Sequence, residues 1–381
     1  TLDSLRFELL ELQEERWNPL DWVYLLGDGL FNLLSREFAP LAVRLASVAG
    51  RVEGLPAVLA GAREALVGTD DGRPVGRFQT EKAIEQLPGI GSLIDEALEM
   101  AAADASPETV ALRPRLEAAA TAAREALAAF EGHLRDVVLP RSAGEGRLGE
   151  RLFAAKMRRT MQSETLTPER ILTEAEGEYT AVRAEMVRLA RDAWTTWCPG
   201  RPLPLDDGAI VRGVLDAVAV DHPPASELLD FCRAANVGIE DFCREHDLIG
   251  LGDEPMEIRW TPEFLRSFAG AMFIAPGVLD RGLTSFFAIT PIPDDWPPER
   301  AESKLREDNA RMLRLLTIHE AVPGHYLQSV YEHRATSLPR AIFASGLFAE
   351  GWAVYVTQVM IDVGYGADDA GLLLNHWKFY L

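Results

Sequence analysis

The stretch RPRLEAAATAAREALAAFEGHLRDVVL, residues 113–139, places Ala, Leu and Val at intervals of three and four positions, with Arg and Glu between them. This spacing puts the apolar side chains on one face of an α-helix. Residues 44–66 show the same pattern, and Thr167 followed by Pro168 is typical of a helix start. Turn-forming residues interrupt the helical pattern only briefly before about residue 250. We therefore predict a large helical region over residues 1–250.

The pattern changes after residue 250. Three short segments, 257–260, 271–274 and 284–290, are rich in β-branched or aromatic residues and are separated by Pro and Gly. Helical spacing returns at about residue 302 and continues to the end of the chain. We predict that residues 251–381 contribute a small antiparallel β-sheet and further helices, and that both regions form one continuous body. The expected fold class is mostly α.

Composition restricts the partners of this protein. The 381 residues include 38 Lys and Arg against 59 Asp and Glu, which gives a formal net charge of −21. Because no basic surplus is available to neutralise phosphates, we expect neither nucleic acid nor a membrane surface as a partner. The sequence contains no run of about 18 apolar residues, so no transmembrane helix is predicted. The oligomeric state leaves no signal in the sequence.

The three cysteines, Cys198, Cys232 and Cys243, do not form a disulfide framework, and this favours a reducing compartment. Residues 1–16 are charged and amphipathic, unlike a signal peptide. We therefore predict a cytoplasmic protein. Residue 1 is Thr rather than Met, which is compatible with removal of an upstream segment.

One motif carries candidate chemistry: His319-Glu320-Ala321-Val322-Pro323-Gly324-His325. On an unbroken helix, two histidines six positions apart would point about 120° away from each other and lie about 9 Å apart along the axis. They could not both lie about 2.1 Å from one zinc ion. Pro323 removes a backbone donor and disfavours helical geometry at the preceding residue, and Gly324 can adopt a positive φ. We therefore predict a break after Glu320 that returns His325 toward His319.

A catalytic zinc site needs a third protein ligand and an open coordination position. Glu350 is the best candidate for the third ligand, because it lies on a second helical stretch whose apolar neighbours imply burial. Glu320, adjacent to His319, would then act as the general base that takes a proton from water and passes it to the leaving group.

At these residues a resemblance to known proteins appears. The motif from His319 to His325, followed by Glu350-Gly351-Trp352-Ala353, resembles the bacterial family numbered 885 in the series of domains of unknown function, over nearly the whole chain. That family is similar to the mostly helical zinc carboxypeptidases of the Taq type. The resemblance implies a gluzincin-like metallopeptidase with His319, His325 and Glu350 as zinc ligands and Glu320 as general base. It also implies that the strand at Thr284 to Thr290 is an edge strand that pairs with a peptide substrate.

Members of that family continue beyond the helix of Glu350, whereas residues 371–381 here are apolar and end without a helix cap. We therefore expect that the carboxyl end of the protein is missing from this chain. A residue that stabilises the oxyanion of the reaction could lie in that part. Within the chain the candidates for this role are Tyr326, Tyr331, Tyr355 and His376, and the sequence does not choose among them.

The sequence thus predicts a mostly α-helical, zinc-dependent peptidase acting on peptides or small peptide-like amides. Three alternatives stay open. The first is a non-catalytic metal-binding or scaffold protein with the same fold. The second is non-haem iron in place of zinc, since two histidines and a carboxylate also suit that metal. The third is a second zinc site at Cys232, Cys243 and His246, for which packing of the two cysteines in a core is the favoured interpretation.

Overall fold

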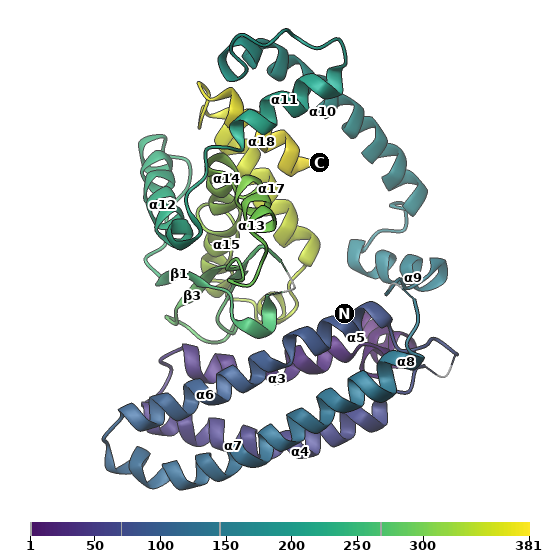
Figure 1. Ribbon diagram of the computed structural model, residues 1–381, viewed down its shortest axis with the longest axis vertical. Helices are drawn as coiled ribbons and strands as arrows, with labels where there is room; N and C mark the ends of the chain where they lie inside the picture. Colours follow the sequence, from purple (N-terminus) through teal and green to yellow (C-terminus); the bar gives the residue numbers. More distant parts are fainter. Residues whose placement is uncertain (1, 70, 145, 267–268) are drawn as a thin grey trace. The chain divides into compact units, whose positions relative to one another are not determined.

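The computed structural model describes residues 2–69, 71–144, 146–266 and 269–381 (Figure 1). The chain forms two compact units. Unit 1 comprises Thr1–Arg159 and Thr261–Gly270, and unit 2 comprises Thr160–Trp260 and Ala271–Leu381. The change of sequence pattern near residue 250 therefore lies within unit 2 and does not separate the compact units.

Unit 1 is built mainly from helices. The long helices α3, α4, α6 and α7 lie alongside one another (Figure 1). The helical elements are α1 (Leu2–Phe7), η1 (Glu8–Leu12), α2 (Glu14–Trp17), α3 (Pro19–Ser35), α4 (Leu41–Ala65), α5 (Arg77–Gln86), α6 (Pro88–Ala103), α7 (Pro107–His133), η2 (Leu134–Val138), α8 (Leu139–Arg141), α9 (Glu150–Met161) and η4 (Glu263–Leu265).

The long helices of unit 1 begin where the sequence provides caps. The side chain of Asn18 accepts a hydrogen bond from the backbone of Leu20 at the start of α3, and Ser106 accepts one from Thr109 at the start of α7. A proline occupies the first turn of both helices, where its missing N–H is not needed. The two predicted apolar stretches lie in α4 and in α7 with its continuation, so this part of the prediction is confirmed.

Unit 2 contains a small sheet and the helices that carry the candidate site. Its elements are α10 (Pro168–Trp197), α11 (Asp207–Val218), η3 (Ala225–Glu227), α12 (Leu228–Glu245), β1 (Met256–Trp260), β2 (Ala271–Ile274), β3 (Ser285–Ile289), α13 (Pro298–Glu307), α14 (Ala310–Glu320), α15 (His325–His333), α16 (Leu338–Ile342), α17 (Gly346–Asp362) and α18 (Ala370–Tyr380). The predicted helix start at Thr167 and Pro168 is confirmed, because the Thr167 side chain caps α10.

The sheet is mixed rather than wholly antiparallel. Its strand order is β1-β3-β2, with β1 parallel and β2 antiparallel to β3. Strand β3 is therefore the central strand, and the predicted edge strand at Thr284 to Thr290 is wrong. Every residue of β3 is buried, which is typical of a strand covered on both faces. The expected fold class, mostly helical with a small sheet, is confirmed.

Helix α14 is surrounded by the core of unit 2. Leu313 packs in a cluster with residues of α12, β1 and β3, whereas Ile318 packs with residues of α12, α15 and α17. Of the described helices, none combines the length and apolar character needed to cross a membrane. The packing of α14 matters for function because its last two residues are His319 and Glu320.

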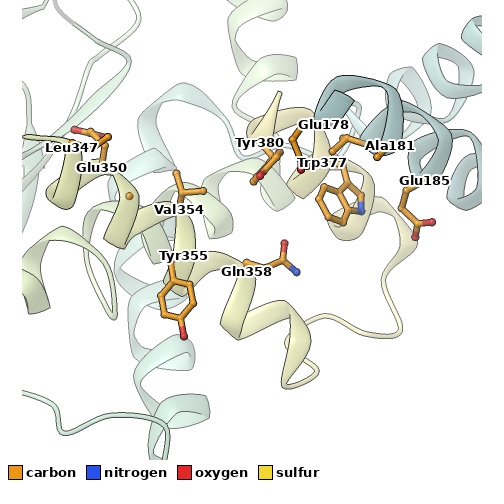
Figure 2. A pocket seen from close by; sticks show the side chains of 12 residues that line it. Glu178, Ala181, Glu185, Leu347, Glu350, Val354, Tyr355, Gln358, Trp377 and Tyr380 are labelled. Carbon is orange, nitrogen blue, oxygen red and sulfur yellow. The ribbon is translucent and has the colours of Figure 1, made fainter. Parts of the chain in front are cut away.

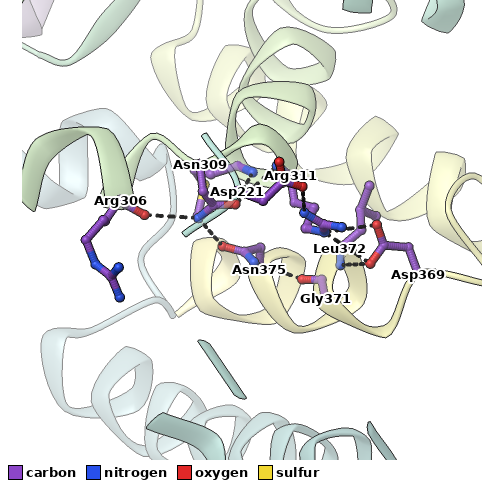
Figure 3. A network of polar contacts seen from close by, with 9 residues as sticks. Asp221, Arg306, Asn309, Arg311, Asp369, Gly371, Leu372 and Asn375 are labelled. Carbon is purple, nitrogen blue, oxygen red and sulfur yellow. Dashed lines mark hydrogen bonds and ion pairs between the residues drawn. The ribbon is translucent and has the colours of Figure 1, made fainter. Parts of the chain in front are cut away.

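A polar network fixes the start of α14 against α18 (Figure 3). The side chain of Asn309 caps α14 by accepting from the backbone N–H groups of Arg311 and Met312, and its Nδ2 donates to Oδ1 of buried Asn375 at 3.1 Å. Arg311 in turn pairs with Asp369, the cap of α18, at 3.0 Å. These partly buried bonds hold the two helices in one register.

Candidate metal centre

The chain turns between the two histidines of the motif. Helix α14 ends at Glu320 and helix α15 begins at His325, so the predicted break is confirmed. The turn contains a cis peptide bond between Val322 and Pro323. Gly324 has a φ of −75°, so the positive φ suggested by the sequence is not adopted. Glycine is required for another reason, because a Cβ there would lie 1.9 Å from the carbonyl oxygen of His319.

Replacing Gly324 with Ala should destabilise the protein, because the added methyl group meets a backbone carbonyl that can move only by displacing His319. We expect the free energy of unfolding of the metal-free protein to fall by about 3 kcal/mol, measured by urea denaturation. Gly177→Ala in α10 is the matched control, since its added Cβ would meet no described atom within 4 Å beyond the backbone of its own helix. That change should be neutral or stabilise by up to about 1 kcal/mol, and equal losses in the two variants would contradict this explanation.

The turn brings three ligand-type side chains together. Oε2 of Glu350 lies 3.8 Å from Nε2 of His319 and 3.7 Å from Nε2 of His325. The ligand atoms of all three residues lie within 4.8 Å of one another. Two atoms that each bind a metal at about 2.1 Å can be no more than about 4.2 Å apart. Both histidine–carboxylate distances meet this limit. Two imidazole nitrogens and one carboxylate oxygen are also the donor types that bind zinc.

Glu350 differs from the other two ligands in its exposure. The side chains of His319 and His325 are 11% and 13% exposed, whereas that of Glu350 is 71% exposed. The expectation of a buried Glu350 is therefore wrong, because the buried positions of α17 begin only at Ala353. The neighbouring Trp352 donates its indole N–H to the carbonyl oxygen of Pro323 at 3.0 Å. This bond ties the helix of Glu350 to the turn between the histidines.

Burial sets the charge of His319. Loss of hydration, followed by the nearby His325, lowers the pKa of His319 to about 4. The imidazole is therefore neutral at physiological pH, which is the form that binds a metal. Its Nδ1 is buried and has no hydrogen-bond partner among the described residues, while Nε2 faces Glu350.

Glu320 is buried beside the ligands, with 7% of its surface exposed. Burial, followed by the negative charge of Glu350, raises the pKa of Glu320 to about 7. The backbone N–H of Phe273 on β2 opposes this shift by hydrogen bonding to the carboxylate. A carboxyl group with a pKa near neutrality can both accept and return a proton, which is what a general base and acid must do.

The four candidates for oxyanion stabilisation differ in their hydrogen bonds and in their exposure. The hydroxyl of Tyr326 donates to the carbonyl of Glu254 at 2.5 Å, and that of Tyr331 donates to the carbonyl of Gly250 at 2.9 Å. His376 is buried, with Nε2 2.9 Å from Oε1 of Gln358. Tyr355 is 62% exposed and lines the same cavity as Glu350.

His376 should make the stability of the protein dependent on pH. Burial lowers its pKa from 6.5 to about 4, so between these values the unfolded state binds a proton that the folded state does not. Stability should therefore fall as the pH is lowered from about 6.5 to 4, by up to about 3 kcal/mol from this residue. Urea denaturation across this range should show a shallower loss for His376→Gln than for the wild type. The change His246→Gln, at an exposed histidine, should leave the slope unchanged, and equal slopes in all three proteins would contradict the assignment.

The predicted alternative of a second zinc site does not form. Cys232 and Cys243 lie in two different hydrophobic clusters, and burial raises the pKa of their thiols to about 12 and about 11. His246 stacks on Phe242 instead. Within residues 2–69, 71–144, 146–266 and 269–381, the group of His319, His325 and Glu350 is the one set of three such ligands that converges.

Residues 2–378 match the family described as "Bacterial protein of unknown function (DUF885)". The chain belongs to the DUF885 family. This match confirms the family resemblance that the two motifs indicated. No curated protein is significantly similar to this DUF885 chain.

Two solved structures resemble this DUF885 protein. One is a predicted lipoprotein of unknown function from Shewanella oneidensis, with a TM-score of 0.69 and 28% identity, over 100% of this chain and 67% of that one. The other is a predicted lipoprotein from Colwellia psychrerythraea, with a TM-score of 0.65 and 16% identity, over 88% of this chain and 58% of that one. The second likeness, at this identity, concerns the fold alone.

The first of these similarities corrects the predicted location. The structure from Shewanella oneidensis is described as a lipoprotein, a class that is membrane-anchored or secreted, and the prediction of a cytoplasmic protein is therefore wrong. Three unpaired cysteines were its main support. All three are buried, so their reduced state follows from packing and carries no information about the compartment.

A cavity that could not be predicted from the sequence adjoins Glu350 (Figure 2). Its volume is about 600 Å³, and side chains of α10, α17 and α18 line it, with Glu350 among them. Ligand-binding pockets in proteins have volumes of about 300–1,000 Å³. The cavity could not be predicted because its walls come from helices separated by about 170 residues of chain, whose packing no local pattern specifies.

Proposed function

We propose that this DUF885 protein is a zinc-dependent hydrolase that cleaves peptide or amide bonds. The observation that carries the proposal is the convergence of His319, His325 and Glu350, with ligand atoms within 4.8 Å of one another. Two histidines and a glutamate are the protein ligands in one class of catalytic zinc sites. A zinc ion held by them would supply Lewis acidity, which polarises a carbonyl group and makes a water molecule more acidic.

Glu320 would move the proton in this reaction. Its carboxylate takes a proton from the attacking water as the water oxygen bonds to the carbonyl carbon. It then returns that proton to the nitrogen as the C–N bond breaks, so the products are a carboxylic acid and an amine. The raised pKa of Glu320, about 7, supports this role because the group can exist in both protonation states at neutral pH.

The expected similarity between the fold of this family and that of the zinc carboxypeptidases of the Taq type supports a peptide substrate. The exposed side chain of Glu350 supports it further, because this ligand is accessible from the cavity and from solvent.

A direct test of catalysis uses the protein loaded with one equivalent of zinc and a mixed peptide library. We expect cleavage products by mass spectrometry, their loss when the metal is chelated, and their return when zinc is restored. Absence of cleavage by the fully zinc-loaded protein would contradict the hydrolase proposal and favour the non-catalytic metal-binding alternative.

A further inference from the structure

We infer that the cavity beside Glu350 binds a positively charged group of the substrate, an ammonium or a guanidinium, against an aromatic wall. The inference rests on the proposed function, since it names the substrate class of the same site. Figure 2 shows the two sides of the cavity, with Glu350 and Val354 on α17 and with Trp377 and Tyr380 on α18, next to Glu178 on α10.

The charge of the cavity is negative. Of its twelve described lining residues, three are glutamates and none is Arg or Lys. Glu185 is already neutralised, because Arg188 contacts both of its carboxylate oxygens, at 2.5 and 2.8 Å. Glu350 belongs to the ligand group. The remaining carboxylate is that of Glu178, whose side chain makes no hydrogen bond or ion pair with any described residue.

The aromatic wall is well suited to a cation. The rings of Trp377 and Tyr380 meet edge to face, with centroids 5.7 Å apart. Trp377 is held in place by packing against the hydrophobic cluster shared by α10, α11 and α18, while Tyr380 is 42% exposed. Aromatic faces attract ammonium and guanidinium groups, and an adjacent carboxylate adds a charge-assisted hydrogen bond.

The same features exclude an anionic substrate group. A carboxylate entering the cavity would meet the carboxylate of Glu178 and would find no basic side chain among the described lining residues. A carboxypeptidase that holds the terminal carboxylate of its substrate needs a cationic partner for it. The cavity therefore suits either a free amino terminus or the side chain of Lys or Arg.

Isothermal titration calorimetry of the metal-free protein tests the inference without relying on hydrolysis. The probes are acetylated and amidated tripeptides Phe-X-Ala, in which X is Lys, norleucine or Glu, together with the norleucine peptide carrying a free amino terminus. At low salt we expect at least one of the cationic peptides to bind about fivefold or more tightly than the capped norleucine peptide, and the Glu peptide to bind most weakly. Tight binding of the capped Lys peptide identifies the side chain as the source of the charge, and tight binding of the uncapped peptide identifies the amino terminus.

Substitution at Glu178 makes the test specific to this cavity. Glu178→Gln should reduce the cationic preference to less than about twofold, because the charge-assisted bond is lost. Glu176→Gln, at an exposed position of the same helix outside the cavity lining, should retain it. Equal binding of charged and neutral peptides, a preference for the Glu peptide, or an unchanged preference in Glu178→Gln would overturn the inference. Failure of the zinc-loaded protein to cleave peptides while this preference persists would instead count against the proposed function alone.

Discussion

Replacing Glu320 with Gln is expected to lower kcat for peptide hydrolysis by about 100- to 10,000-fold, the contribution typical of a general acid–base group. Gln has nearly the same shape as Glu but cannot accept a proton at neutral pH. Because Glu320 lies outside the convergent ligand group, the variant should bind metal as the wild type does. Its stability should not fall, since the change removes a carboxyl group whose burial raises its pKa.

Steady-state kinetics on a cleaved library peptide, with metal content measured on the same samples, would check this expectation. Glu332→Gln is a suitable control, because this glutamate is on α15 and accepts from Gln328 rather than facing the ligands. The control should retain wild-type kcat. Undiminished turnover by the Glu320 variant would refute its role as general base.

Replacing His325 with Ala is expected to weaken zinc binding by more than about 100-fold, because losing a residue that only hydrogen-bonds to a metal ligand can already cost about 10- to 100-fold in affinity. The variant loses one of three protein ligands, and the remaining pair, His319 and Glu350, cannot complete a catalytic zinc site. The fold should persist, because His325 is the first residue of α15 and lies outside the hydrophobic cluster that Tyr326 and Leu327 join.

Competition with a chromophoric chelator would measure the zinc affinity of the His325 variant. His246→Ala is the matched control, since this exposed histidine stacks on Phe242 and takes no part in the ligand group. The control should bind zinc as the wild type does. Full zinc affinity in the His325 variant would exclude this residue as a ligand.

The helices could be predicted from the sequence because their signals are local. The apolar periodicity in α4 and α7 and the cap at Thr167 each act within a few residues. The order of the strands could not, because β1 pairs with β3 and the intervening Thr261–Gly270 belongs to unit 1. The pairing of β1 with β3 depends on how the chain between them packs, and the residue pattern of a single strand does not specify that packing.

The candidate site divides in the same way. His319, Glu320 and His325 could be found because the Pro323–Gly324 break and the ligands lie within one short motif. The sequence suggested that Gly324 is needed for a positive φ, which the structure does not show. Glycine is needed because the carbonyl oxygen of His319 lies close to it, and this contact exists only in the folded turn. Glu178 and Tyr380 reach the cavity from helices that are distant in the sequence. Glu350 is exposed because it lies in the first turns of α17, before the buried residues of that helix begin at Ala353.

Elemental analysis of the protein purified without chelators tests the central claim most directly. We predict about one equivalent of zinc per chain, bound in the wild type and absent from a variant in which His319, His325 and Glu350 are all replaced by Ala. Iron in place of zinc would contradict the assigned metal while leaving the ligands intact. Less than about a tenth of an equivalent of any transition metal, even after incubation with zinc, would contradict the metal centre itself.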